Sequence, residues 1–178
     1  MNQDSKQIYI VLTYTGTFLS KIIKFYTHAE YAHVSLSLDH ELNKMYSFGR
    51  KHPYNPFIGG FVHEKLNSGT FKRFKKTKAL IYVLNLSDKQ YEKIEEVIQK
   101  FERRRNIYKF NIIGLFGSAF NLKYRKKNTF YCAEFVKYLM DEANLNLELP
   151  ELVKPIDFKK IENLEIVFQG ILKNYQVV

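Results

Sequence analysis

A stretch of alternating polar and apolar residues near the N-terminus constrains the fold of this chain most. Between residues 33 and 39, histidine, serine and aspartate alternate with valine and leucine. Because successive side chains of a strand point to opposite faces of a sheet, this period of two predicts a half-buried β-strand. Residues 40–43 carry a turn signal, and residues 44–48 are expected to be the returning strand of a hairpin. The chain is therefore expected to contain an antiparallel sheet.

Further apolar runs and helical patterns surround this hairpin. Strands are predicted at residues 7–14, 79–86 and 164–171. Helices are predicted at residues 17–26, from a capping box at Ser87 and Gln90 to residue 104, at 111–122 and from Cys132 to residue 143. Residues 49–60 hold two prolines and a glycine pair and are expected to be a loop. This order predicts an α+β fold, an antiparallel sheet with helices packed on one side, in a single domain over residues 1–178.

Charge and cysteine content limit the partners and the compartment. Twenty-eight Lys and Arg against 18 Asp and Glu give a net charge of +10, which indicates either a solvated surface that keeps the protein soluble or an anionic partner such as a charged substrate or a lipid surface. No nucleic-acid-binding motif accompanies the charge, so nucleic acid is not expected. The apolar run at residues 8–12 is too short for a signal peptide or a membrane span, and the single cysteine excludes an internal disulfide. A cytoplasmic protein without a metal site or cofactor is expected, and its oligomeric state is left open.

The one cysteine stands at the start of a helical pattern. Cys132 precedes apolar residues at helical spacing, and Asn128 or Thr129 is the expected N-cap. The free N–H groups and the positive dipole end of a first helical turn favour an anion such as a thiolate. His33, on the polar face of its strand, is the side chain that would take the thiol proton. The alternative is a small buried core residue, the common fate of a free cysteine.

The stretches around His33 and around Cys132 resemble a known family. Residues 31–36 (YAHVSL) and 130–136 (FYCAEFV) are similar to the histidine strand and the nucleophile helix of the YiiX-like proteins, the circularly permuted branch of the NlpC-type papain-like hydrolases. Lecithin retinol acyltransferase-like proteins are more distant relatives. Residues 16–20 and 46–50 also look like that family, and the resemblance spans roughly residues 8–158. It implies a circularly permuted papain-like (NlpC-type) fold and a catalytic dyad of Cys132 and His33.

The resemblance also implies a third polar group that orients the imidazole. Relatives often carry Glu or His on the strand after the histidine, and this chain has Ser47 at that position. A serine orients the ring weakly, because a hydroxyl cannot stabilise an imidazolium as a carboxylate does. Glu64 is the alternative orienting residue if residues 61–64 fold back beside the site.

Two further residues are candidates for substrate binding. Tyr131 would contribute an oxyanion donor or a pocket wall, with an ordinary core aromatic as the alternative. Arg50 would bind a substrate carboxylate, with a solvent-exposed loop arginine as the alternative.

The expected function is a cysteine hydrolase, an amidase or peptidase that cleaves an amide or acyl bond through a Cys132 thioester with His33 as general base. The resemblance implies a small peptide-like or acyl substrate, which the basic surface allows to be anionic. An acyltransferase or lipid-acyl hydrolase on the same site is one alternative. A non-catalytic binding protein that uses the basic surface is the other.

Overall fold

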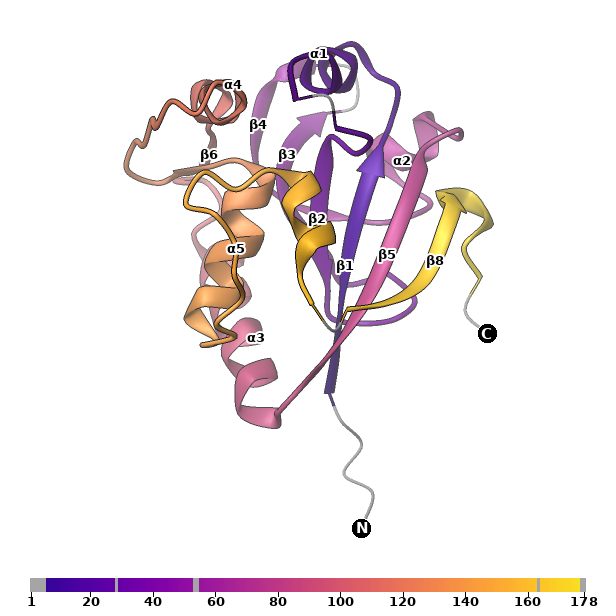
Figure 1. Ribbon diagram of the computed structural model, residues 1–178, viewed down its shortest axis with the longest axis vertical. Helices are drawn as coiled ribbons and strands as arrows, with labels where there is room; N and C mark the ends of the chain where they lie inside the picture. The colour runs from indigo at the N-terminus through magenta and orange to yellow at the C-terminus, as the bar shows by residue number, and fades with distance from the viewer. Residues whose placement is uncertain (1–5, 28, 53–54, 163, 177–178) are drawn as a thin grey trace.

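A six-stranded antiparallel sheet runs through the middle of the molecule, in the strand order β4-β3-β2-β1-β5-β8 (Figure 1). The computed structural model describes residues 6–27, 29–52, 55–162 and 164–176. The strands are β1 (Lys6–Tyr14), β2 (His33–Ser37), β3 (Met45–His52), β4 (Asn55–Glu64), β5 (Lys78–Leu86) and β8 (Glu165–Ile171). The predicted α+β architecture with an antiparallel sheet is confirmed.

Five helices and two short strands complete the described chain. The helices are α1 (Phe18–Thr27), α2 (Gly69–Arg73), α3 (Asp88–Arg103), α4 (Ile112–Ala119) and α5 (Cys132–Glu142). The 3₁₀ turns are η1 (Pro155–Lys160) and η2 (Leu172–Asn174), and β6 (Lys109–Phe110) pairs in parallel with β7 (Thr129–Phe130). The predicted capping box of α3 is present, because Ser87 and Gln90 exchange both of its hydrogen bonds.

The larger core lies between the sheet and the helices α3 and α5. Val34 and Leu36 of β2 face this side and are fully buried, as the alternation predicts. Phe48 of β3 is surrounded there by aromatic rings from α3 and α5, including Phe101 and Phe135. A smaller apolar cluster covers the opposite face, where α2 contributes Phe71. Helices therefore lie on both sides of the sheet, although the two long ones share one side.

The prediction of a loop at residues 49–60 is wrong. Strand β3 continues to His52, and β4 begins at Asn55; Pro53 and Tyr54 lie outside the described residues. The glycine pair marks close packing rather than a turn. A Cβ on Gly59 would lie 2.7 Å from the Cβ of Phe110, and one on Gly60 would lie 2.8 Å from the carbonyl oxygen of Tyr108. Only glycine lets the 108–110 segment approach this strand so closely.

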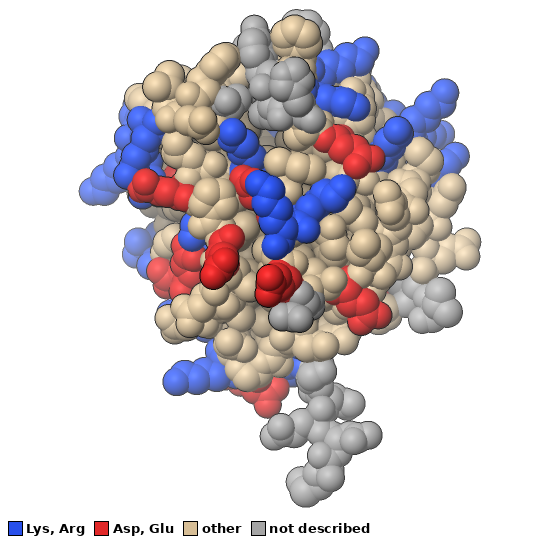
Figure 2. Space-filling model, viewed as in Figure 1, with Lys and Arg blue, Asp and Glu red and all other residues tan. Residues whose placement is uncertain are grey.

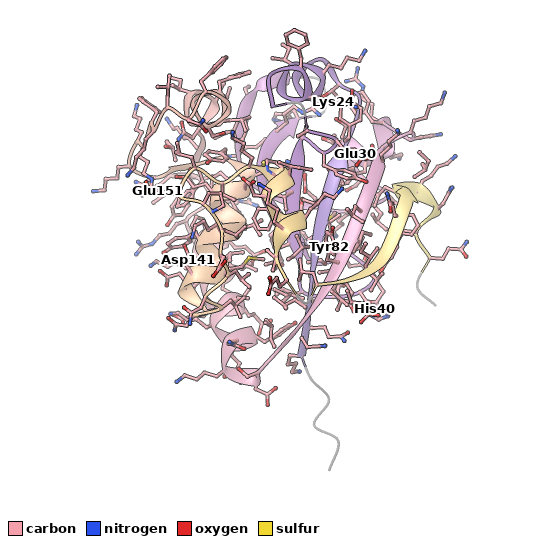
Figure 3. All side chains as sticks on the ribbon, in the orientation of Figure 1. Lys24, Glu30, His40, Tyr82, Asp141 and Glu151 are labelled. Carbon is pink, nitrogen blue, oxygen red and sulfur yellow. The ribbon has the colours of Figure 1, made fainter. Side chains whose placement is uncertain are left out.

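Helix α4 is shorter than predicted and packs against α1 rather than directly on the sheet. The two helices lie together at one end of the molecule (Figure 1). Lys24 marks this end, and His40, in the turn between β2 and β3, lies far from it (Figure 3). The described helices include none that is both long enough and apolar enough to cross a bilayer.

Candidate active site

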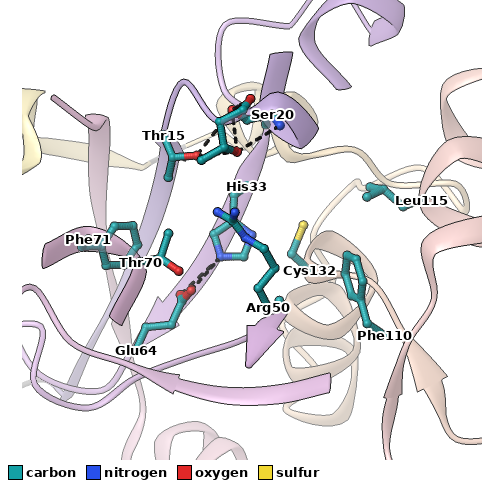
Figure 4. Close-up of a pocket in the computed structure, with 13 residues that line it drawn as sticks. Thr15, Ser20, His33, Arg50, Glu64, Thr70, Phe71, Phe110, Leu115 and Cys132 are labelled. Carbon is teal, nitrogen blue, oxygen red and sulfur yellow. Dashed lines mark hydrogen bonds and ion pairs between the residues drawn. The ribbon is translucent and has the colours of Figure 1, made fainter. Parts of the chain in front are cut away.

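A pocket opens at the end of the sheet where β2 begins and α1 and α4 lie (Figure 4). Its empty volume, including the open mouth, is about 550 Å³, within the range of small-molecule sites. Cys132, His33, Glu64 and Arg50 all line it. Hydroxyl groups of Thr15, Thr17, Ser20 and Thr70 provide a polar wall, whereas Phe71, Phe110 and Leu115 provide an apolar one. Residues far apart in the sequence thus meet around one small space.

Cys132 is the first residue of helix α5. The N-cap is Tyr131 rather than the predicted Asn128 or Thr129, because Thr129 is drawn into strand β7. Phe135, Val136 and Leu139 are fully buried and fix the helix on the sheet, as the sequence pattern predicts. The thiol is only 2% exposed, and that exposure is toward the pocket. Cys132 therefore stands at the positive end of a helix dipole and faces a cavity with polar walls.

His33, the first residue of β2, places its imidazole between Cys132 and Glu64 (Figure 4). Its Nε2 atom lies 3.1 Å from one carboxylate oxygen of Glu64 and 3.3 Å from the other. The hydroxyl of Ser35 donates to the same carboxylate. Because Nε2 faces Glu64, an N–H on that atom would donate to the carboxylate and leave Nδ1 for the thiol.

Both pKa values in the His33–Glu64 pair shift toward the charged forms. Burial alone would lower the pKa of His33, but the Glu64 carboxylate and a hydrogen bond with Cys132 raise it to about 10. Burial would raise the pKa of Glu64, but His33, the Ser35 hydroxyl and Arg50 hold it below its usual value. The side chains of His33 and Glu64 are 22% and 14% exposed, so solvent screens this attraction only weakly. The pair is therefore an imidazolium–carboxylate pair at neutral pH.

Ser47 does not orient the imidazole. The side chain is fully buried, and its hydroxyl donates to the backbone carbonyl of Val34 at a distance of 2.7 Å. The predicted role fails because Nε2 of His33 faces the Glu64 carboxylate and the Ser35 hydroxyl, whereas the Ser47 hydroxyl is held at the Val34 carbonyl of the neighbouring strand. Glu64, the alternative named from the sequence, is the residue that contacts His33. It extends from the end of strand β4 rather than from a loop.

Glycine at position 49 makes room for the imidazole. A Cβ on Gly49 would lie 3.4 Å from Cε1 of His33 and 3.9 Å from a carboxylate oxygen of Glu64. The first distance is tighter than most real Cβ contacts, so a larger residue would press on the ring. Gly49 and Ser35 are the two parts of the site that sequence reasoning missed. The serine two residues after the histidine, on the same face of the strand, was the available signal.

Arg50, the residue expected from the sequence to bind a substrate carboxylate, lines the pocket. Its guanidinium is 5.7 Å from the ring centre of Phe74, a cation–π distance. Burial and the nearby charge of Arg73 lower its pKa, whereas Glu64 opposes that shift. No ion pair within 4.0 Å joins it to an acidic residue of the described chain. A cation thus faces the cavity without a close carboxylate partner.

Tyr131 is a core residue rather than part of the pocket. It is 3% exposed, and its hydroxyl donates to the carbonyl of Val153 at 3.0 Å. Burial, followed by the charge of Glu134, raises the pKa of this phenol. The prediction that Tyr131 binds substrate is therefore wrong, because Tyr131 is not among the residues that line the pocket and its hydroxyl already donates to the Val153 carbonyl.

Within the described ranges, no group of three or more His, Cys, Asp or Glu side chains is arranged to hold a metal ion. His28 lies outside these ranges.

No family model, no curated protein and no solved structure matches this chain. The resemblance to the YiiX-like proteins therefore stays a prediction.

Proposed function

We propose that the protein is a cysteine hydrolase that cleaves an amide or acyl bond through a thioester on Cys132. One observation carries the proposal: Cys132, at the start of α5, lines the same pocket as an imidazole that is paired with a carboxylate. A nucleophile, a base and a residue that orients the base are the recurring parts of such sites. The chain order, His33 before Cys132, fits the proposed circularly permuted papain-like fold.

The acylation step needs one proton transfer and one bond exchange. His33 already holds, on Nδ1, the proton that the Cys132 thiol has given up, and the thiolate sulfur attacks the substrate carbonyl carbon. The carbonyl oxygen becomes an oxyanion, which the N–H groups of the first turn of α5 would hold, since these groups have no partner within the helix. The tetrahedral adduct then collapses to the thioester, and the leaving group departs with the proton from His33.

The deacylation step reverses the roles of the imidazole. His33, now neutral, takes a proton from a water molecule as that water attacks the thioester carbonyl. Collapse of the second adduct releases the acid and the Cys132 thiolate, and the proton taken from water stays on His33 as in the starting state. Glu64 and Ser35 keep Nε2 engaged through both steps and stabilise the imidazolium. An acceptor other than water would make the same site an acyltransferase.

The pocket walls define the substrate that we propose. Phe110 and Leu115 offer an apolar surface for an acyl or side-chain group next to the thiol. Arg50 offers a positive charge for a carboxylate, so a small peptide-like or acyl substrate with negative charge fits best. The single free thiol also agrees with a reducing, cytoplasmic compartment.

Alkylation of Cys132 tests the proposal without a known substrate. The protein has one cysteine, so iodoacetamide labelling followed by mass spectrometry reports this thiol alone. We expect the thiol to react at neutral pH much faster than free cysteine and His33→Gln to lose that advantage. Equal alkylation rates for the original protein and His33→Gln, with circular dichroism showing both folded, would contradict the proposal. That result would favour a non-catalytic binding protein.

A further inference from the structure

The segment that leads into helix α5 carries nearly all of the excess positive charge. Residues 103–133 contain eight Lys and Arg and no Asp or Glu. The rest of the chain, with 20 basic and 18 acidic residues, is almost neutral. A charge distribution so concentrated points to an anionic partner for this segment rather than to general solubility.

The same segment exposes large apolar side chains. Ile113 and Leu122 are 61% and 65% exposed, and Ile107 is 48% exposed. Helix α4 contains no charged residue, although one of its sides faces solvent. Leu115 points into the catalytic pocket, whereas Ile113 points outward. A surface helix normally presents polar side chains to water, so the outer side of α4 suits an apolar environment.

Charged and apolar side chains share one hollow on this surface. Ile107, Ile113 and Tyr124 line it together with Lys109, Lys126 and Lys127. Asn111 fixes its floor: the side chain accepts from the N–H of Gly114 and donates to the carbonyl of Tyr124. Phe110 lines this hollow and also the catalytic pocket. The basic and apolar surface is therefore the immediate neighbour of Cys132.

Several of the cations have no acidic partner. Lys123 and Arg125 form ion pairs with Glu151 and Glu134. Glu151 lies beside the loop that joins α4 to β7 (Figure 3). Lys109, Lys126 and Lys127 are exposed and form no ion pair with an acid of the described chain. Figure 2 shows Lys and Arg gathered along the margin over this loop.

We propose that this surface, made by Ile107, Ile113 and the lysines 109, 126 and 127, docks on a membrane that contains anionic phospholipid. Aliphatic side chains enter the acyl boundary while lysines contact phosphate headgroups, the arrangement of interfacial membrane binding. Single-stranded nucleic acid would instead require a series of exposed aromatic stacking platforms, and the aromatic residues of the hollow are the exposed Tyr124 and the half-buried Phe110, which also lines the catalytic pocket. Docking would place the wall formed by Phe110, and with it the catalytic pocket, beside the lipid surface.

Sedimentation with vesicles tests the docking surface. The full-length protein should sediment with vesicles of phosphatidylcholine and phosphatidylglycerol but not with pure phosphatidylcholine, and salt should weaken the binding. Lys126→Gln with Lys127→Gln should lower the partition coefficient about 25-fold, since each lysine near an anionic surface contributes about fivefold. Ile107→Ser with Ile113→Ser should also reduce it strongly.

Matched controls lie elsewhere on the surface. Lys75→Gln with Lys76→Gln removes the same charge from another exposed lysine pair, and Ile166→Ser removes another exposed isoleucine. Both controls should bind vesicles almost as the original protein does.

Equal losses in test and control variants, or no binding to anionic vesicles, would overturn the proposal. The surface would instead be assigned to nucleic acid if the original protein bound a labelled oligonucleotide but no vesicles. The variant with Lys126→Gln and Lys127→Gln would then have to lose the oligonucleotide binding. Cys132 alkylation should be unchanged in every variant, so this outcome is separate from the proposed catalysis.

Discussion

The two faces of strand β2 are both buried, but they are built from opposite chemistry. On one face Val34 and Leu36 pack into a core of rings and aliphatic chains. On the other, His33 and Ser35 meet Glu64 in a network of hydrogen bonds. The apolar face is held by contacts that have no required direction, whereas every polar group on the second face needs a partner at a defined position. One face therefore supplies stability and the other supplies a fixed imidazole.

The largest expected effect belongs to the apolar face. Phe48 is fully buried, and its ring lies 5.2 Å from the ring centres of both Phe130 and Phe135. Phe48→Ala should lower the free energy of unfolding by about 3–5 kcal/mol, because it removes buried area and leaves a cavity. Urea unfolding followed by circular dichroism measures this loss. A loss below that of a typical surface substitution would mean that the ring cluster is not the main source of stability.

The polar face should affect reactivity more than stability. Glu64→Gln keeps the shape of the side chain but removes the charge beside His33, and we expect Cys132 alkylation to slow about 100-fold. Ser47→Ala is the matched control on the same sheet, because its hydroxyl bonds only to the Val34 carbonyl. That variant should lose about 1 kcal/mol of stability and keep the alkylation rate. If alkylation were slower in Ser47→Ala but not in Glu64→Gln, Ser47 rather than Glu64 would be the residue that orients His33.

A pH series sharpens the same contrast. The pKa of His33 is raised from 6.5 to about 10 by Glu64 and Cys132, against the effect of burial. Between these values the folded state binds the proton that the unfolded state has lost, so stability is full below pH 6.5 and falls as pH rises toward 10. The slope is at most about 1.4 kcal/mol per pH unit.

Urea unfolding at several pH values checks this slope. It is best measured in a Cys132→Ala background, which removes the titration of the thiol itself. Glu64→Gln should flatten the curve, because the carboxylate that holds the proton on His33 is gone. Parallel curves with and without Glu64 would show that the pair does not stay charged in the folded protein.

The smallest expected effect concerns the cation at the pocket. Arg50→Gln should lower the ratio of the iodoacetate to the iodoacetamide alkylation rate about fivefold, because the attraction for the carboxylate reagent is lost. Arg73→Gln is a close control, since its guanidinium lies 5.2 Å from the same Phe74 ring but does not line the pocket. An unchanged ratio in Arg50→Gln would remove Arg50 from substrate recognition while leaving Cys132 and His33 in place.

The sequence predicts those parts of the fold that depend on local pattern. The strand after His33, the capping box at Ser87 and the apolar face of α5 each depend on neighbouring residues, and all three are confirmed. The half-burial predicted for that strand is wrong, because Ser35 and Ser37 on its polar face are buried as well. The long β3–β4 hairpin was mistaken for a loop because Gly59 and Gly60 have the composition of a turn. Their actual role, contact with Phe110 and the Tyr108 backbone, depends on a segment about 50 positions away.

The candidate site shows the same limit. Cys132 and His33 could be named as a pair, but their orienting residue could not be chosen, because Ser47 and Glu64 lie on adjacent strands whose side-chain reach is set by the completed sheet. Strand alternation placed Ser47 on the correct face. It could not show that Glu64 and Ser35 would be the residues at Nε2 of His33, or that the Ser47 hydroxyl would be held at the Val34 carbonyl.

The parallel pairing of β6 with β7 has a consequence for what can be removed from this protein. Antiparallel strands can be joined by two residues, but parallel strands need a crossover of about a dozen or more. The 18 residues from 111 to 128 are that crossover, and the pairing places Phe110 beside Phe130, two residues before Cys132. A deletion that shortened them to a tight turn would separate β6 from β7 and release the start of α5, whatever side chains remained. The length of the 111–128 segment is thus a requirement of the topology, separate from the contacts that its side chains make.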